Sequence, residues 1–270
     1  MSAVVDPKPN AAPTWVLLRG LSRESGHWGS FPRVLETVLG GAENGARLVM
    51  LDLPGNGSLY RETSPTQVPE LVARCRAELA RQGVVGPVHL LAMSLGAMVA
   101  ADWSRRFPKE VAGAVLINTS LRPFSPFYRR LRPMNYLTLM LLSLSRLGTR
   151  QRESKVLAMT TRLLPDPDAV LDAWVALQLR HPVRVLNIVR QLLAALRYRA
   201  SAARPEVPML LLCSQADGLV DWRCSQAISR AWGAPLRLHT KAGHDLPLDD
   251  GPWVARAVAE WLRALGGLPA

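Results

Sequence analysis

A serine, an aspartate and a histidine occupy positions from which they could act together in nucleophilic catalysis: Ser94, Asp217 and His244. A serine hydroxyl is a weak nucleophile unless a base removes its proton as the new bond forms. Histidine, whose ordinary pKa is about 6.5, can take that proton and pass it to a leaving group. An aspartate beside the imidazole fixes its tautomer and stabilises its charged form. We therefore ask whether the fold brings the three together.

Ser94 lies where a buried strand turns directly into a helix. Residues 88–93 are mostly apolar, as in a strand covered on both faces, and an Ala- and Met-rich helical segment follows. Ala92 and Gly96 are small enough for the tight bend of a nucleophile elbow. The bend would direct the N–H of Leu95 to where a negatively charged oxygen forms. The alternative is a buried helix start that Ser94 merely caps.

Strand-like and helix-like segments alternate along both ends of the chain. Strands are predicted at 14–19, 47–53, 88–93, 111–118, 207–213 and 236–240, and helices at 31–39, 67–81, 95–107, 221–232 and 251–265. This alternation predicts an α/β fold with a mostly parallel sheet and helices on both faces. Between them, residues 121–204 show only helical patterning, which predicts an inserted helical cap. The core is then 15–120 and 205–270, after a disordered lead at 1–14.

In such a sheet, catalytic groups gather beyond the carboxyl ends of the strands, where Ser94, Asp217 and His244 are all expected. Asp221 is a weaker alternative to Asp217, because we expect it to cap the next helix. His239 lies inside the last predicted strand, and we expect its side chain to be packed or exposed on the sheet rather than in the site.

Together these segments resemble the α/β-hydrolase superfamily, in its lid-bearing carboxylesterase and lipase-like group, over about residues 15–265. The resemblance is carried by LRG at 18–20, DLPGNG at 52–57, AMSLG at 92–96, SQADGLV at 214–220 and AGH at 242–244. It implies an oxyanion hole formed by the N–H groups of Leu21 and Leu95, and the triad order Ser94, Asp217, His244.

Two positions depart from the superfamily pattern. Arg19 stands before Gly20 where a histidine is usual, and Ala92 replaces the first glycine of the elbow. Arg19 puts a cation beside the expected site. We expect it to line the pocket, together with His27 in the following loop and Met93 before the nucleophile.

The 270-residue chain has a formal net charge of +12 at pH 7, and about +11 of it falls within residues 121–204. The sequence has no zinc-finger, helix-turn-helix or RNP-like signature, so we expect no nucleic-acid partner. The basic cap fits an anionic membrane surface, an acidic partner or an anionic substrate, or simply a solvated arginine-rich face. Residues 136–142, an apolar run bordered by arginines, could touch a lipid surface or form the inside of the lid.

The sequence contains no apolar run long enough for a membrane span and no secretory signal at its start, which predicts a cytoplasmic protein. Its three cysteines have no metal-ligand spacing, and we expect them to be reduced, with no metal or organic cofactor in the site.

The expected reaction is hydrolysis of a carboxylic ester, or of a thioester or lactone, in a small-molecule substrate through an acyl-enzyme. Carbon–carbon bond hydrolysis uses the same three residues and stays open, because the fold does not settle the reaction. A binding protein without catalysis is the third alternative.

Overall fold

The computed structural model describes residues 13–40, 46–135, 138 and 147–266. Residues 1–12 of the predicted lead and, apart from Thr138, the apolar run at 136–142 lie outside the described residues. Thr14, at which the predicted lead and the predicted first strand overlap, begins the first strand.

Six strands form one parallel sheet. They are β1 (Thr14–Leu18), β2 (Arg47–Leu51), β3 (Val88–Met93), β4 (Val111–Ile117), β5 (Met209–Ser214) and β6 (Leu236–His239), in the spatial order β2-β1-β3-β4-β5-β6. Every neighbouring pair runs parallel. All strands therefore end at the same edge of the sheet, and the predicted fold class is confirmed.

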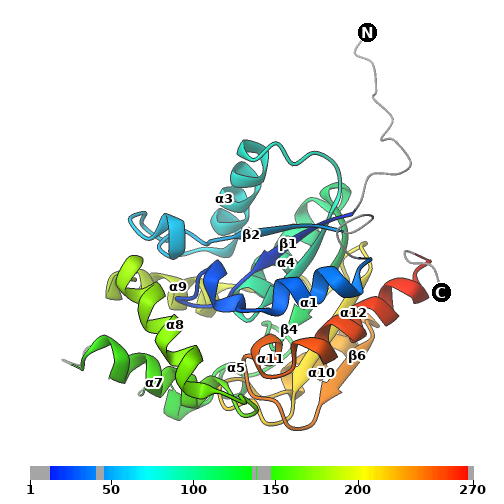
Figure 1. The fold of residues 1–270 in the computed structure, drawn as a ribbon. Coiled ribbons are helices and arrows are strands. Elements are labelled where there is room, and N and C mark those ends of the chain that lie inside the picture. Colours follow the sequence, from blue (N-terminus) through cyan, green and yellow to red (C-terminus); the bar gives the residue numbers. More distant parts are fainter. Residues whose placement is uncertain (1–12, 41–45, 136–137, 139–146, 267–270) are drawn as a thin grey trace.

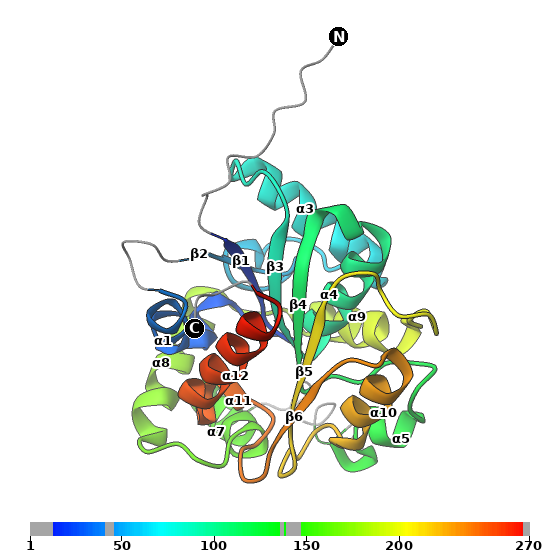
Figure 2. The same ribbon diagram turned by 90° about the vertical axis from the view of Figure 1, so that its right-hand side faces the viewer.

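Helices cover both faces of the sheet (Figure 2). One face carries α1 (Phe31–Val38), α11 (Leu246–Asp249) and α12 (Gly251–Ala264), and the other carries α3 (Val68–Arg81), α4 (Leu95–Arg106) and α10 (Arg223–Trp232). Short 3-10 turns lie at Ser25–Trp28, Gly57–Leu59 and Pro108–Glu110.

The alternation of side chains along β1 explains the two layers. Trp15 and Leu17 join the apolar cluster under α1 and α12, whereas Val16 and Leu18 join the cluster under α3 and α4. Successive strand residues point to opposite faces, so a strand that is apolar throughout must be covered on both sides. This is why the central strands contain unbroken apolar runs.

Between β4 and β5 the chain leaves the sheet and forms the helices α5 (Phe127–Arg130), α7 (Thr149–Thr160), α8 (Pro167–Arg180) and α9 (Val185–Arg197). We call this part the helical insertion. It lies beside the ends at which the strands finish (Figure 1). Leu157 of α7 and Leu171 and Trp174 of α8 form its own small apolar cluster. Pro167 is the first residue of α8, a position at which a proline's missing N–H removes no hydrogen bond within the helix. Asp166 caps the helix by accepting a hydrogen bond from Ala169 N.

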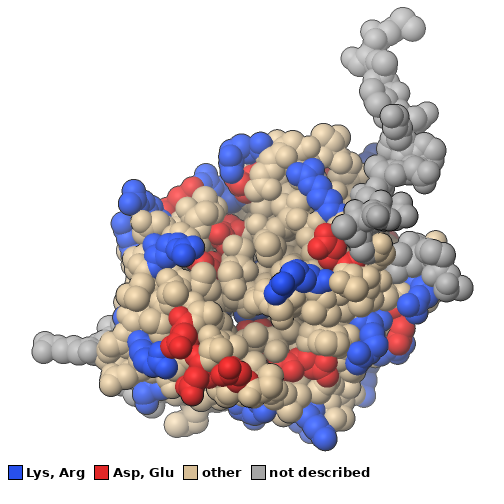
Figure 3. Space-filling view, in the orientation of Figure 1, with Lys and Arg blue, Asp and Glu red and all other residues tan. Residues whose placement is uncertain are grey.

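On the face seen in Figure 3, basic and acidic side chains are interspersed. All three cysteines are free and buried. Within the described part of the chain, no helix is both long enough and apolar enough to cross a membrane.

Candidate active site

Ser94 occupies a sharp turn between β3 and α4. Its backbone has φ 55° and ψ −116°, in a region that non-glycine residues rarely adopt. A Cβ on Gly96 would lie 2.5 Å from the carbonyl oxygen of Arg19 and 2.6 Å from that of Leu18. Only glycine therefore lets α4 approach β1 this closely. The turn exposes Ser94 to the cavity described below and leaves it at the head of a helix.

Asp217 and His244 lie together at the carboxyl edge of the sheet. His244 Nδ1 is 2.7 Å from Asp217 Oδ2, and both side chains are buried. The other carboxylate oxygen of Asp217 accepts hydrogen bonds from Leu219 N at 2.7 Å and Val220 N at 3.0 Å. With Nδ1 held by the carboxylate, Nε2 is the imidazole nitrogen that remains for proton transfer.

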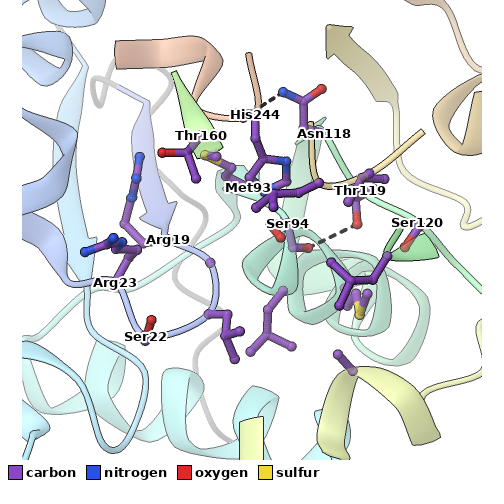
Figure 4. A pocket seen from close by; sticks show the side chains of 18 of the residues that line it. Arg19, Ser22, Arg23, Met93, Ser94, Asn118, Thr119, Ser120, Thr160 and His244 are labelled. Atoms are coloured by element: carbon purple, nitrogen blue, oxygen red, sulfur yellow. Dashed lines mark hydrogen bonds between the residues drawn. The ribbon is translucent and has the colours of Figure 1, made fainter. Parts of the chain in front are cut away.

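Ser94 and His244 line the same cavity (Figure 4). No hydrogen bond joins the Ser94 hydroxyl to the imidazole in the structure of the described residues. Such bonds are often long in a site without substrate and tighten once substrate is present. The three predicted residues are thus brought to one place, with the aspartate–histidine contact already formed.

Asn118 has a positioning role that the sequence analysis missed. It follows β4 with a φ of 44°. Its amide nitrogen donates to the carbonyl oxygen of His244 at 2.7 Å, and its amide oxygen accepts from Ser214 N at 2.8 Å. Asn118 therefore ties the histidine loop to the ends of β4 and β5. A polar residue directly after an apolar strand was the signal that could have revealed it.

Leu21 and Leu95 are the residues whose N–H groups the sequence resemblance predicts as an oxyanion hole. Both residues line the cavity, and neither N–H donates to a protein acceptor among the described residues. Leu21 lies in a turn closed by a hydrogen bond from Arg23 N to Gly20 O at 3.3 Å. A Cβ on Gly20 would lie 3.0 Å from the Ser94 Cβ, so this turn packs directly against the nucleophile elbow.

Arg19 makes a buried ion pair across the site. Its Nη1 and Nη2 atoms contact the two carboxylate oxygens of Asp245 at 3.0 Å and 2.5 Å. Its guanidinium also lies over the ring of Trp28, 4.7 Å from the ring centre. A bidentate pair of this kind has a fixed geometry. It therefore ties the end of β1 to the residue that follows His244.

Of the three residues expected in the pocket, Arg19 and Met93 line the cavity, and His27 does not. The prediction for His27 is wrong because its 3-10 turn points the ring into the interface with the helical insertion. There the ring packs against Trp174 and lies 2.9 Å from Arg23 Nη1. Burial, followed by the nearby cations of Arg23 and Arg19, holds the pKa of His27 well below its ordinary value.

The alternative acid and histidine lie elsewhere, as expected. Asp221 accepts a hydrogen bond from Arg223 N at 2.9 Å at the start of α10. His239, at the end of β6, lies 3.2 Å from Asp250 Oδ2. Neither of them lines the cavity.

The cavity has a volume of about 140 Å³ and lies between the strand ends and the helical insertion. Its walls are mainly apolar, with contributions from the core at Met93 and Met98 and from the insertion at Leu131, Val156 and Leu192. Among the described residues, no cluster of histidine, cysteine or carboxylate side chains could hold a metal ion.

Comparison with known proteins identifies the family. The sequence model of the alpha/beta hydrolase family matches residues 15–257. This chain belongs to that family.

This hydrolase is similar in sequence to named proteins and in fold to solved structures. RutD of Cronobacter turicensis, a protein named for carbamate hydrolysis, is 27% identical over 86% of this chain and 84% of its own length. An esterase from Thermogutta terrifontis superimposes with a TM-score of 0.71 at 19% identity, over 95% of this chain and 91% of the esterase. An enol-lactonase from Burkholderia xenovorans superimposes with a TM-score of 0.75 at 15% identity, over 94% of this chain and 92% of the enol-lactonase. At these identities the two structures establish the likeness of fold.

Proposed function

We propose that this hydrolase cleaves carboxylic esters through a serine acyl-enzyme. The observation that carries the proposal is the 2.7 Å contact between His244 Nδ1 and Asp217 Oδ2, with His244 lining the same cavity as a serine held at φ 55°. The backbone N–H groups of Leu21 and Leu95, which have no acceptor within the part of the chain that the structure describes, belong to residues that line the same cavity. This arrangement contains a nucleophile, an oriented base and donors for a developing negative charge, which are the elements that acyl transfer needs.

The reaction follows from these positions. Ser94 Oγ attacks the ester carbonyl while His244 Nε2 accepts its proton, and the carbonyl oxygen becomes negatively charged between the two N–H groups. The intermediate collapses when His244 returns the proton to the alcohol, which leaves. Water, deprotonated by the same histidine, then attacks the acyl-serine; the acid is released as the imidazolium returns that proton to Ser94 Oγ. Asp217 keeps the imidazole in the required tautomer and stabilises the imidazolium in both steps.

The apolar walls favour an uncharged acyl group, and the cavity size favours a short one. A volume of about 140 Å³ is below the range of about 300–1,000 Å³ that drug-sized ligands occupy. The names of the relatives point to carbonyl compounds as well, namely carbamate, ester and enol-lactone. We therefore place the substrates among small esters, with thioesters and lactones as close chemical neighbours.

The test is hydrolysis of p-nitrophenyl esters from acetate to palmitate by the wild type and by Ser94→Ala, His244→Ala and Asp217→Asn. Each substitution should lower kcat by about a hundredfold or more, because it removes the nucleophile, the base or the group that orients the base. Activity should be greatest for acetate to butyrate. Asp221→Asn is the matched control for Asp217→Asn and should keep wild-type activity. Turnover that survives Ser94→Ala, or no turnover of any ester, would refute the proposal.

A further inference from the structure

Helix α9 of the insertion is fastened to the core through two buried amides, one turn apart. Asn187 and Gln191 lie on the same side of the helix, and both side chains are almost completely buried. A buried amide is costly unless its donors and acceptor are satisfied, so its partners show what it holds in place. Both amides hold the loop after β2, and Gln191 also holds the turn that contains Leu21.

Gln191 contacts the turn that carries the oxyanion donor. Its Oε1 accepts a hydrogen bond from Ser22 N at 2.8 Å. Its Nε2 donates to Asn56 Oδ1 at 2.8 Å and to Ser64 Oγ at 2.9 Å. Asn56 in turn donates from Nδ2 to the carbonyl oxygen of Arg23 at 3.1 Å. The network therefore holds the turn at its middle peptide and at its last residue.

The conformation of this turn requires such support. Ser22 has a φ of 54°, which a residue with a side chain adopts only at a cost in free energy. The bond to Gln191 fixes the peptide group between Leu21 and Ser22 in this arrangement. The peptide that carries the Leu21 N–H immediately precedes it, so a change in the turn would move that N–H away from the cavity.

We infer that Gln191 is a positioning residue for the oxyanion hole and that it makes catalysis depend on the docking of the helical insertion. This inference rests on the proposed function. The insertion then does more than form the cavity wall, since α9 places one of the two donors to the transition state. Gln191 does not line the cavity, and it acts through the turn alone.

Asn187 provides a matched control on the same helix. Its Oδ1 accepts from Ser64 N at 3.0 Å and its Nδ2 donates to the carbonyl oxygen of Glu62 at 2.9 Å. It therefore docks α9 to the loop after β2 without a contact to the turn at Leu21. A defect that comes only from loosened docking should appear equally in variants at both positions.

The experiment compares Gln191→Met with Asn187→Leu in the full chain, using p-nitrophenyl butyrate and thermal melting. We expect both variants to lose similar amounts of thermal stability. Only Gln191→Met should lose about tenfold or more in kcat with little change in KM, because an oxyanion hole acts on the transition state. The affinity for an alkyl trifluoromethyl ketone, whose serine adduct places an oxyanion in the hole, should fall by a similar factor.

Gln191→Glu separates a positioning role from a stabilising one. It keeps an oxygen acceptor for Ser22 N and loses the amide donors, so kcat should exceed that of Gln191→Met although the melting temperature is no higher. Equal kcat losses in Gln191→Met and Asn187→Leu, or a loss confined to KM, would overturn the inference. If the wild type neither hydrolyses esters nor reacts with a fluorophosphonate at Ser94, the proposed function itself fails, and the inference falls with it.

Discussion

The contact between Arg19 and Asp245 shows how a residue that departs from the family pattern is accommodated. Each side chain is about 3% exposed, and the partners are 226 residues apart in the sequence. A buried charge that loses its partner is strongly destabilising, whereas replacing both charges is much less so. The pair joins the loop before the oxyanion turn to the loop of His244, so its integrity bears on catalysis as well as on stability.

We expect Arg19→Met or Asp245→Asn alone to lower the free energy of unfolding by about 3–5 kcal/mol, because each leaves an uncompensated buried charge. The double substitution should lower the free energy of unfolding by clearly less than the sum of the losses in the two single variants. Urea denaturation of the four proteins completes the double-mutant cycle. Strictly additive losses would show that the two side chains do not stabilise each other.

Helix α4 depends on a close approach that only glycine permits. A Cβ on Gly96 would meet the carbonyl oxygens of Leu18, the last residue of β1, and of Arg19, which follows it. These are backbone atoms, so they cannot rotate away as a flexible side chain could. The elbow, the first turn of α4 and the end of β1 are therefore fitted to one another. Thr119 adds a brace, since its hydroxyl donates to the carbonyl oxygen of Ser94 at 3.1 Å.

Gly96→Ala should therefore lower the free energy of unfolding by about 2 kcal/mol or more through overpacking. It should also reduce ester hydrolysis, because the displaced helix carries the Leu95 N–H away from the cavity. Gly148→Ala is the control, since a Cβ at Gly148, at the start of α7, would meet no atom within 4 Å. Both variants are compared by denaturation and by kcat. Equal losses of unfolding free energy and of kcat in Gly96→Ala and Gly148→Ala would contradict the packing argument.

Across the whole molecule, histidines whose pKa is lowered by burial make the fold sensitive to acid. His89 of β3 stacks on Trp15 with ring centres 4.7 Å apart, and burial lowers its pKa to about 4. In the unfolded chain its pKa returns to about 6.5. The stability that neutral His89 contributes is therefore complete above about pH 6.5 and is lost as the pH falls through about 4.

We expect the free energy of unfolding to fall by about 3 kcal/mol from this histidine alone between pH 7 and pH 4. His89→Phe should keep the stacking on Trp15. Its free energy of unfolding should fall less between pH 7 and pH 4 than that of the wild type, by the amount that His89 contributes. His89 Nδ1 has no hydrogen-bond partner among the described residues, so phenylalanine removes no bond from that atom. Urea denaturation at a series of pH values measures the difference. Parallel pH profiles for the two proteins would contradict this assignment.

Much of the fold could be predicted because its signals are local. Apolar runs such as residues 88–93 identify strands buried on both faces, and their alternation with helices predicts a parallel sheet. Small residues around Ser94 predict the sharp turn that the structure contains. Since parallel strands all end at one edge, the sequence also predicted that Ser94, Asp217 and His244 would meet there. Their catalytic roles stay a prediction until activity is measured.

The tertiary structure decided which side chains touch across long separations. The sequence could place Arg19 beside the site, but not pair it with Asp245. It placed His27 in the right loop, yet its ring turns to Trp174 rather than to the cavity. The sequence could not predict the hydrogen-bond partners of Asn118 and Gln191 either. Periodicity and turn propensity report the chain's local path, whereas these contacts depend on how separate segments pack, and that is determined only when the whole chain folds.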